Sequence, residues 1–333
     1  MKNTGFKNKQ QGMTLVEIMI ALVLGAFLLG GVMQIFLSSK QSYQMQDGMS
    51  RLQENGRFAM DFLTRDIRMA DYWGCIRSAS LVESNLNAGS EYDNFNNGIS
   101  GTNNDNGGND GDADNDENGN SIWDGTDTIS LRGAFGADIF VVNIPANTSA
   151  DLKVTDESEL NENDVLLVSD CTAGDIFQVT NDPGTGGAPN KDEVVHNTGG
   201  LPAVGDPEYP GNFEKMFQKI YETDAQVYRL TFVTYSIRDS GGEPTLSRSI
   251  NGAAIQDLVE GIEDMQILYG EDTDGDLSPD YYVDADAVAD MERVVSIRIT
   301  LTARTLSTNL TTTGDGRLRR TFSTTIAVRN RLI

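Results

Sequence analysis

Four aspartates stand at short, regular spacing in the segment EDTDGDLSPDYYVD, residues 271–284. Counted from the first of them, they occupy positions 1, 3, 5 and 9, and they are Asp272, Asp274, Asp276 and Asp280. Carboxylates at alternate positions of a tight loop can converge on one hard cation, and Ca²⁺ takes roughly six to eight oxygen ligands. The spacing therefore makes this segment a candidate calcium site.

The same segment departs from the EF-hand loop, the calcium motif that its spacing resembles. Glycine stands at relative position 4 instead of 6, and Val283 occupies position 12, where the motif has glutamate. Strand-like runs on both sides would make the segment a hairpin loop, so a plain solvated turn remains the alternative. A second acidic stretch, residues 103–120, is nearly devoid of apolar residues. It predicts a long loop and is a further calcium candidate.

A single acid interrupts an apolar run near the N-terminus. From Met13 to Leu37 the chain has 25 residues, and Glu17 is their only charge. At about 1.5 Å per residue, a helix of this length spans a hydrocarbon core of about 30 Å. A carboxylate inside such a helix costs roughly 2.5–3.5 kcal/mol. Glu17 therefore needs a cationic partner, a proton or a position near the membrane interface.

The residues before this run form a basic, polar leader. Residues 1–12 hold Lys2, Lys7 and Lys9, contain no acid and end in Gly12. The positive-inside rule places such a leader in the cytoplasm. A secretory signal has its small-residue cleavage site after the apolar segment. Here the small-residue junction precedes that segment.

The order of basic leader, Gly12, Met13, apolar run and Glu17 resembles the processing site of the type IV prepilins. The resemblance implies that a membrane peptidase cuts after Gly12 and methylates the new N-terminus, Met13. Glu17 then becomes the fifth residue of the mature chain. The family usually has phenylalanine after the cut, and Gln34 stands where many major pilins carry proline. An ordinary signal anchor with a stray acid is the alternative interpretation.

The prepilin interpretation gives Glu17 a physical role. After cleavage, the amine of Met13 in one subunit can pair with Glu17 of another inside a bundle of such helices. Low dielectric strengthens the attraction, and removal of one member leaves a buried charge uncompensated. We therefore predict that Glu17 sets the registry of assembly and is not a catalytic acid.

The helical pattern continues beyond the apolar run. Small and apolar residues recur at alternating steps of three and four and thus share one face. They are Met45, Met49, Leu52, Gly56, Ala59, Leu63, Ile67 and Ala70. We expect one helix of nearly 60 residues. Residues 13–37 would be its membrane or pilus-core half, and residues 38–70 its amphipathic half.

Residues 71–333 change to short β-prone runs separated by turns. The segment SGGEP, residues 240–244, is a hairpin signal. The expected strands are 126–133, 138–144, 164–170, 175–180, 225–238, 265–270, 293–305 and 319–330. In the last of them Phe322, Thr324, Ile326 and Val328 alternate onto one face. The fold class predicted is α+β, with the long helix packed on a mostly antiparallel β head.

The chain has two cysteines, Cys75 and Cys171. Under the prepilin interpretation the head lies outside the cytoplasm, where a disulfide is permitted. Closing a loop of this length contributes about 4–5 kcal/mol in the chain-entropy model. Two buried free thiols are the alternative.

Composition argues against two other classes of function. The formal net charge is −25, so nucleic-acid binding through a broad basic face is not expected. His196 is the only histidine and stands in the polar stretch EVVHNTGG, where we expect it to be solvated. No G-x-S-x-G or phosphate-binding loop is present, so the chain is not expected to be an enzyme.

Within the prepilin class the chain resembles the large minor pilins of the PilW family. The likeness rests on the N-terminal helix and, less extensively, on DYWGC, DGTDTISLRG, VSDCTAGDIFQVT, YGEDTDGDLSPDYYVDA and VVSIRITLTAR. It implies a minor pilin that helps to initiate pilus assembly and sits at the pilus tip, supporting twitching motility, adhesion or DNA uptake. The alternative is a pseudopilin of a type II secretion system. A membrane-anchored structural β protein would not explain Gly12 or Glu17.

The resemblance also implies partners and a location. Other minor pilins and the major pilin would bind through the N-terminal helix, and the prepilin peptidase would process it. The chain would cross the inner membrane once, with its N-terminus cytoplasmic and its head periplasmic. It would then enter a pilus at the cell surface.

Overall fold

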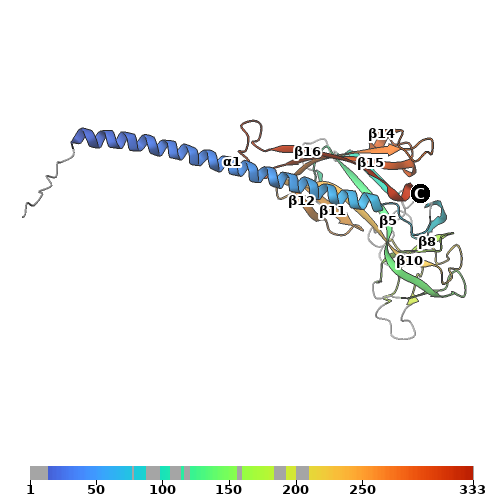
Figure 1. Cartoon of the computed structure of the whole chain (residues 1–333). Helices are drawn as coiled ribbons and strands as arrows, with labels where there is room; N and C mark the ends of the chain where they lie inside the picture. The colour runs from blue at the N-terminus through green and yellow to red at the C-terminus, as the bar shows by residue number, and fades with distance from the viewer. Residues whose placement is uncertain are drawn as a thin grey trace, which may run out of the picture. The chain divides into compact units, whose positions relative to one another are not determined.

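The structure is a computed structural model with one long helix and two β-sheets (Figure 1). It describes residues 14–76, 79–87, 98–105, 114–115, 121–155, 160–183, 193–199 and 210–332. Gly12 and Met13 lie outside these residues, as does most of the acidic stretch 103–120. The chain divides into two compact units, one with Met1–Arg51 and Ser307–Leu318 and one with Leu52–Leu306 and Arg319–Ile333. The α+β class is as predicted.

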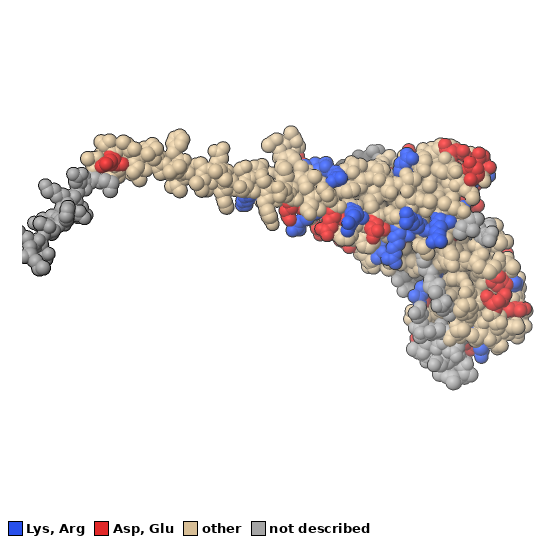
Figure 2. Space-filling view, viewed as in Figure 1, with Lys and Arg blue, Asp and Glu red and all other residues tan. Residues whose placement is uncertain are grey.

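The helix α1 begins at Leu15 and ends at Met69. Its first half is long and apolar enough to cross a membrane. The large apolar side chains of this half are exposed, and Phe27, for example, is 82% exposed. Figure 2 shows the same stretch almost free of charged side chains on the visible face, apart from an acidic group near its start. A single chain therefore leaves this half without an apolar environment.

The second half of α1 packs on the β region. The buried side of the helix follows the predicted stripe, with Leu52, Gly56, Ala59, Leu63 and Ile67. Polar contacts fix its position, since the side chain of Asn55 donates to the carbonyl of Glu260 at 2.9 Å. The hydroxyl of Tyr235 donates to Asp66 at 2.5 Å. Beyond the helix end, the Asn330 side chain donates to the carbonyl of Ala70 at 2.9 Å.

The larger sheet has twelve strands. They are β1 (Val82–Ser84), β2 (Ile99–Asp105), β3 (Asp114–Asn115), β4 (Ser121–Ile122), β5 (Thr126–Asn143), β6 (Leu152–Val154), β7 (Val165–Ser169), β8 (Gly174–Gln178), β9 (Glu193–Val194), β10 (Gln226–Ser240), β11 (Glu243–Ile250) and β12 (Gln256–Glu260). Its main path is β1-β8-β7-β10-β5-β6-β9. Only the β1–β8 pair is parallel among the pairs described.

The smaller sheet is antiparallel throughout, in the order β14-β13-β15-β16. Its strands are β13 (Ile262–Glu271), β14 (Tyr281–Val283), β15 (Val294–Arg304) and β16 (Arg319–Ala327), and short 3₁₀ turns cover Ala79–Leu81, Ala285–Ala287, Met291–Arg293 and Arg329–Arg331. The predicted alternation in β16 is confirmed, because Ile326 and Val328 are buried and Phe322 and Thr324 are half-buried. The odd-numbered residues between them are exposed.

Three sequence expectations need correction. The strands predicted at 126–133 and 138–144 are one strand, β5, because the long β10 pairs with it on both sides of one register shift between Val227 and Arg229. The stretch 103–120 is not all loop, since β2 extends to Asp105 and β3 occupies 114–115. β11 and β12 were not expected, because their polar composition hides the alternation. The turn at 240–244 does connect β10 and β11.

Gly56 marks the closest approach of α1 to the smaller sheet. A Cβ atom at this position would lie 2.2 Å from Cε2 of Phe322 in β16. Glycine usually weakens a helix interior by about 1 kcal/mol relative to alanine. Here the missing side chain lets the Phe322 ring lie against the helix.

Gly56→Ala should therefore destabilise the head. Overpacking costs about 1–3 kcal/mol, and the gain in helix propensity offsets about 1 kcal/mol of it, so we expect a net loss of up to about 2 kcal/mol. Thermal unfolding of the full chain in detergent measures it. In a Phe322→Leu background the same change should become neutral or stabilising, because the clash is gone. Equal effects in both backgrounds would contradict the contact.

Candidate functional site

Glu17 lies in the first turn of α1, where it interacts with Thr14. The Glu17 carboxylate accepts from the backbone N–H and from the hydroxyl of Thr14, both at 3.2 Å. In return, the N–H of Glu17 donates to the Thr14 hydroxyl oxygen at 3.3 Å. This is a capping box, in which the two side chains satisfy free N–H groups at the helix start. The sequence argument missed this second role of Glu17, although the spacing T-x-x-E is the sequence signature of a capping box.

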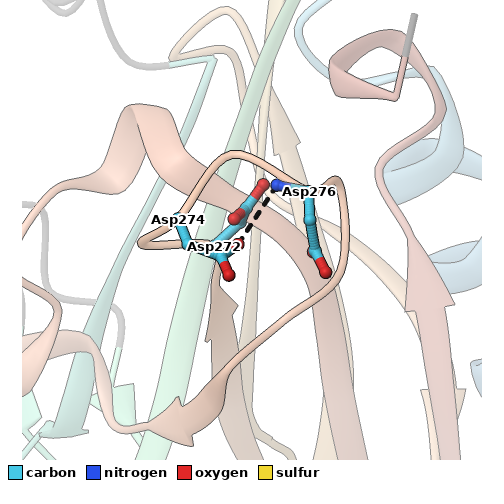
Figure 3. A group of neighbouring side chains, drawn as sticks. All are labelled: Asp272, Asp274 and Asp276. Carbon is cyan, nitrogen blue, oxygen red and sulfur yellow. Dashed lines mark hydrogen bonds between the residues drawn. The ribbon is translucent and has the colours of Figure 1, made fainter.

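The acidic loop 272–280 connects β13 to β14, as the flanking strand patterns indicated. Single carboxylate oxygens of Asp272, Asp274 and Asp276 lie within 4.8 Å of one another. Figure 3 shows the three side chains gathered at the loop, with the N–H of Asp276 donating to Asp274 at 3.2 Å. The structure thus brings together three of the four predicted ligands.

Asp272 organises this loop. One of its oxygens accepts from the N–H of Gly275 at 2.7 Å, and the other accepts from the N–H of Leu277 at 2.9 Å. Burial opposes ionisation of this carboxyl, but these N–H groups outweigh it and hold the pKa of Asp272 below its usual range. Leu277 has a φ of 68°, so the loop adopts a left-handed turn there.

Asp280 does not join the group. Its carboxylate accepts from the N–H of Thr273 at 2.8 Å and also from the Thr273 hydroxyl. The hydroxyl bond is the main reason that the pKa of Asp280 lies below its usual range. Asp280 therefore closes the base of the hairpin and lies outside the group of three carboxylates, so the structure brings together three of the four residues predicted.

A hollow of about 350 Å³ lies beside the acidic loop. Asp272 and Asp274 line one part of it, and Glu292, Arg293 and Arg331 line another. Arg331 is held by Asp71 at 2.5 Å and by the carbonyl of Val294 at 2.9 Å. The two guanidinium groups oppose a cation in the hollow, so the exposed side of Asp274 and Asp276 is the better approach for Ca²⁺.

The two cysteines are joined, as predicted. Cys75 and Cys171 form a disulfide with their Cα atoms 4.7 Å apart. Cys75 lies just beyond the helix end, and Cys171 lies in the turn between β7 and β8. The bond connects the exit of α1 to the larger sheet across a separation of 96 residues.

His196 is buried, and the expectation of a solvated histidine is wrong. Its exposure is 0%, and its ring stacks on Phe217 with centroids 4.2 Å apart. Neither ring nitrogen makes a hydrogen bond of normal geometry to the described residues. Burial lowers the pKa of His196 to about 4, and the Asp151–Lys215 ion pair lies close enough to act on it in opposite directions. His196 is therefore a neutral core residue.

Asp175 is a buried acid that the sequence did not single out. It lies in β8 and accepts from the Tyr221 hydroxyl at 2.5 Å and from the N–H of Gln218 at 3.2 Å. Burial raises the pKa of Asp175 to about 6 against these donors. The contacts fasten the segment after Asn212 to the larger sheet, which is a structural role.

Comparison with known families adds two matches. Residues 234–330 match the type IV pilus-assembly protein W family, and residues 7–33 match the prokaryotic N-terminal methylation motif. No curated protein matches the chain, and no solved structure does. The first match runs from within β10 to the last 3₁₀ turn, so it includes the whole smaller sheet and the acidic loop. The second includes Gly12, Met13 and Glu17.

These matches, with the apolar helix and the β head, define a type IV pilin-like protein that is membrane-anchored and pilus-associated. Within that class the chain resembles pilus-assembly protein W over its C-terminal region.

Calcium binding stays a prediction, and the loop geometry sharpens its test. Three carboxylates, two of them exposed, suit a weak site of about millimolar affinity. Calcium should raise the melting temperature of the full chain, because binding to the folded state alone stabilises that state. The rise should exceed that with magnesium, because convergent carboxylates of a loop suit the roughly six to eight oxygen ligands that Ca²⁺ takes. Asp274→Ala with Asp276→Ala should abolish that rise. Asp286→Ala, at an exposed acid outside the group, should keep it. If millimolar calcium leaves the wild-type melting curve unchanged, only the turn interpretation survives.

Burial of neutral His196 predicts a pH dependence. The unfolded chain takes up the proton near pH 6.5, but the folded chain does so only near pH 4. This group therefore stabilises the fold fully above pH 6.5, and the contribution falls by about 3 kcal/mol as the pH drops to 4. His196→Phe keeps the stack on Phe217 and removes the titration. Its free energy of unfolding should exceed that of wild type by a margin that grows between pH 7 and pH 4.5. A constant margin would show that His196 does not titrate differently in the two states.

Proposed function

We propose that this chain is a minor pilin that takes part in initiating type IV pilus assembly and sits at the pilus tip. There it supports twitching motility, adhesion or DNA uptake. One observation carries the proposal. A methylation-motif helix with an exposed apolar half continues into a head that matches the pilus-assembly protein W family. The match to the pilus-assembly protein W family also favours a pilus over a type II secretion system.

Processing and topology follow from the leader. Cleavage after Gly12 removes a basic segment that stays cytoplasmic, and methylation falls on Met13. The chain crosses the inner membrane once and holds its head in the periplasm before it enters the pilus. The Cys75–Cys171 disulfide supports this placement, because such bonds persist in oxidising compartments.

The exposed half of α1 is the surface for other pilins. In a pilus this half would lie among the equivalent helices of other minor pilins and of the major pilin, which replace lipid as its apolar surroundings. The prepilin peptidase would act on it earlier, at the membrane. Glu17 would exchange part of its contact with Thr14 for the N-terminal amine of a neighbouring subunit.

The head has no role in catalysis under this proposal. His196 is buried against Phe217, and the raised pKa of Asp175 belongs to an acid held by structural contacts. Calcium, if bound at Asp272, Asp274 and Asp276, would order the β13–β14 hairpin. The net charge of −25 argues against direct contact with nucleic acid.

Glu17 variants test the assembly role. Glu17→Ala should insert into the membrane at least as well as wild type, because a costly polar group is gone, and cleavage after Gly12 should still occur. Recovery of partner pilins from detergent extracts should fall sharply, because the neighbouring amine loses its partner. Glu17→Gln keeps an acceptor for the Thr14 N–H but loses the charge, so it separates capping from pairing and should be intermediate. Glu54→Ala, at an exposed acid of the second helix half, is the matched control. Normal complex formation and normal piliation in Glu17→Ala would refute the registry role.

The proposed place in the pilus is tested with sheared fibres. The chain should be present in purified pili at a small fraction of the major subunit, and its deletion should reduce the number of surface pili. Two results together would overturn the proposed function: normal piliation in the deletion strain, and absence of the chain from pili sheared from the wild-type strain.

A further inference from the structure

The strand β16 forms one edge of the smaller sheet. Its only strand neighbour among the described residues is β15. The pairing runs in unbroken register from Ser296 opposite Ala327 to Arg304 opposite Arg319. One side of the strand is therefore fully paired, and the other has no strand beside it.

The register shows which backbone groups face outward. The N–H of Val328 donates to the carbonyl of Val295, so the Ser296–Ala327 pair is not hydrogen-bonded. Bonding to β15 then falls on alternate residues, including Phe322, Thr324 and Ile326. The N–H and carbonyl groups of the intervening residues point away from β15. These residues are Thr321, Ser323, Thr325 and Ala327.

Beyond Arg319 and Arg320 at its start, this edge lacks the features that usually keep edge strands apart. Proteins protect edges with short strands, bulges, proline or charged side chains, lysine above all. β16 has nine residues, no register shift, no proline and no lysine. The other edge of its sheet, β14, has three residues. In the larger sheet β2 is interrupted by a shift between Thr102 and Asp105.

The charges at the two ends of β16 restrict its partner. Arg320 at the start and Arg329 after the end are exposed, and neither forms an ion pair with a described residue. Arg319, beside Arg320, forms an ion pair with Glu263. If two copies paired through β16 in antiparallel fashion, the start of one strand would lie opposite the end of the other, and Arg320 of one copy would approach Arg329 of the other. Like charges that face each other across paired strands are unfavourable, so a dimer through this edge is disfavoured.

We propose that the outward edge of β16 accepts an extended strand of a partner protein that carries acidic residues at both ends of that strand. The backbone groups of Thr321, Ser323, Thr325 and Ala327 would supply the hydrogen bonds of such a strand addition. Arg320 and Arg329 would bind the acidic ends. This contact is separate from the one that α1 makes in the proposed function.

A synthetic peptide tests the proposal without pili. The probe matches β16 in length, alternates valine and threonine and ends in two glutamates at each side. With the full chain in detergent, it should slow amide hydrogen exchange within residues 319–328. A peptide with lysines at its ends should bind less tightly, and one with proline at alternate positions should not bind.

Thr321→Pro supplies the sharper comparison. It removes one outward N–H and leaves the bonds to β15, since proline is tolerated on the free side of an edge strand. Thr321→Val keeps the N–H and a similar shape. Both variants should retain the disulfide and the melting temperature. The probe should bind Thr321→Pro roughly tenfold more weakly than Thr321→Val. Equal binding to the two variants, or no protection of residues 319–328 at millimolar probe, would overturn the proposal.

Discussion

The contact between the second half of α1 and the β region is the constraint on which the head depends. Leu52, Ala59 and Leu63 bury one helix face, and Gly56 lets the ring of Phe322 reach the helix. Residues on two other segments, β10 and the C-terminal 3₁₀ turn, close this contact through hydrogen bonds to the helix or to the residues just after it. They are Tyr235, Asn330 and Arg331. The C-terminal segment thus stabilises the same helix that begins the chain.

Much of this arrangement could be predicted from local patterns. The helix was visible because its stripe repeats every three or four residues, and β16 was visible because Phe322 and Ile326 alternate with polar residues. The single span of β5 could not be foreseen, because its continuity comes from pairing with β10. β11 was missed for a different reason, because its polar composition hides the alternation of a strand.

The functional residues divide in a similar way. The order of Gly12, Met13 and Glu17 identified a prepilin-like N-terminus, since that signal is local and specific. The aspartate spacing correctly predicted that three carboxylates would converge. Asp280 instead accepts a hydrogen bond from Thr273, because the hairpin brings these two residues together. His196 looked solvated from its polar neighbours in sequence. Its burial depends on Phe217, which comes from a distant segment.

The central claim is that one processed helix serves as membrane anchor and as the support of the β head. Intact-mass analysis of the chain extracted from membranes that contain active prepilin peptidase tests it most directly. The account predicts a mature chain that begins at Met13, carries one methyl group on its amine and gains two hydrogens on reduction of the Cys75–Cys171 disulfide. A chain that retains residues 1–12, or one cut after the apolar run, would contradict the account.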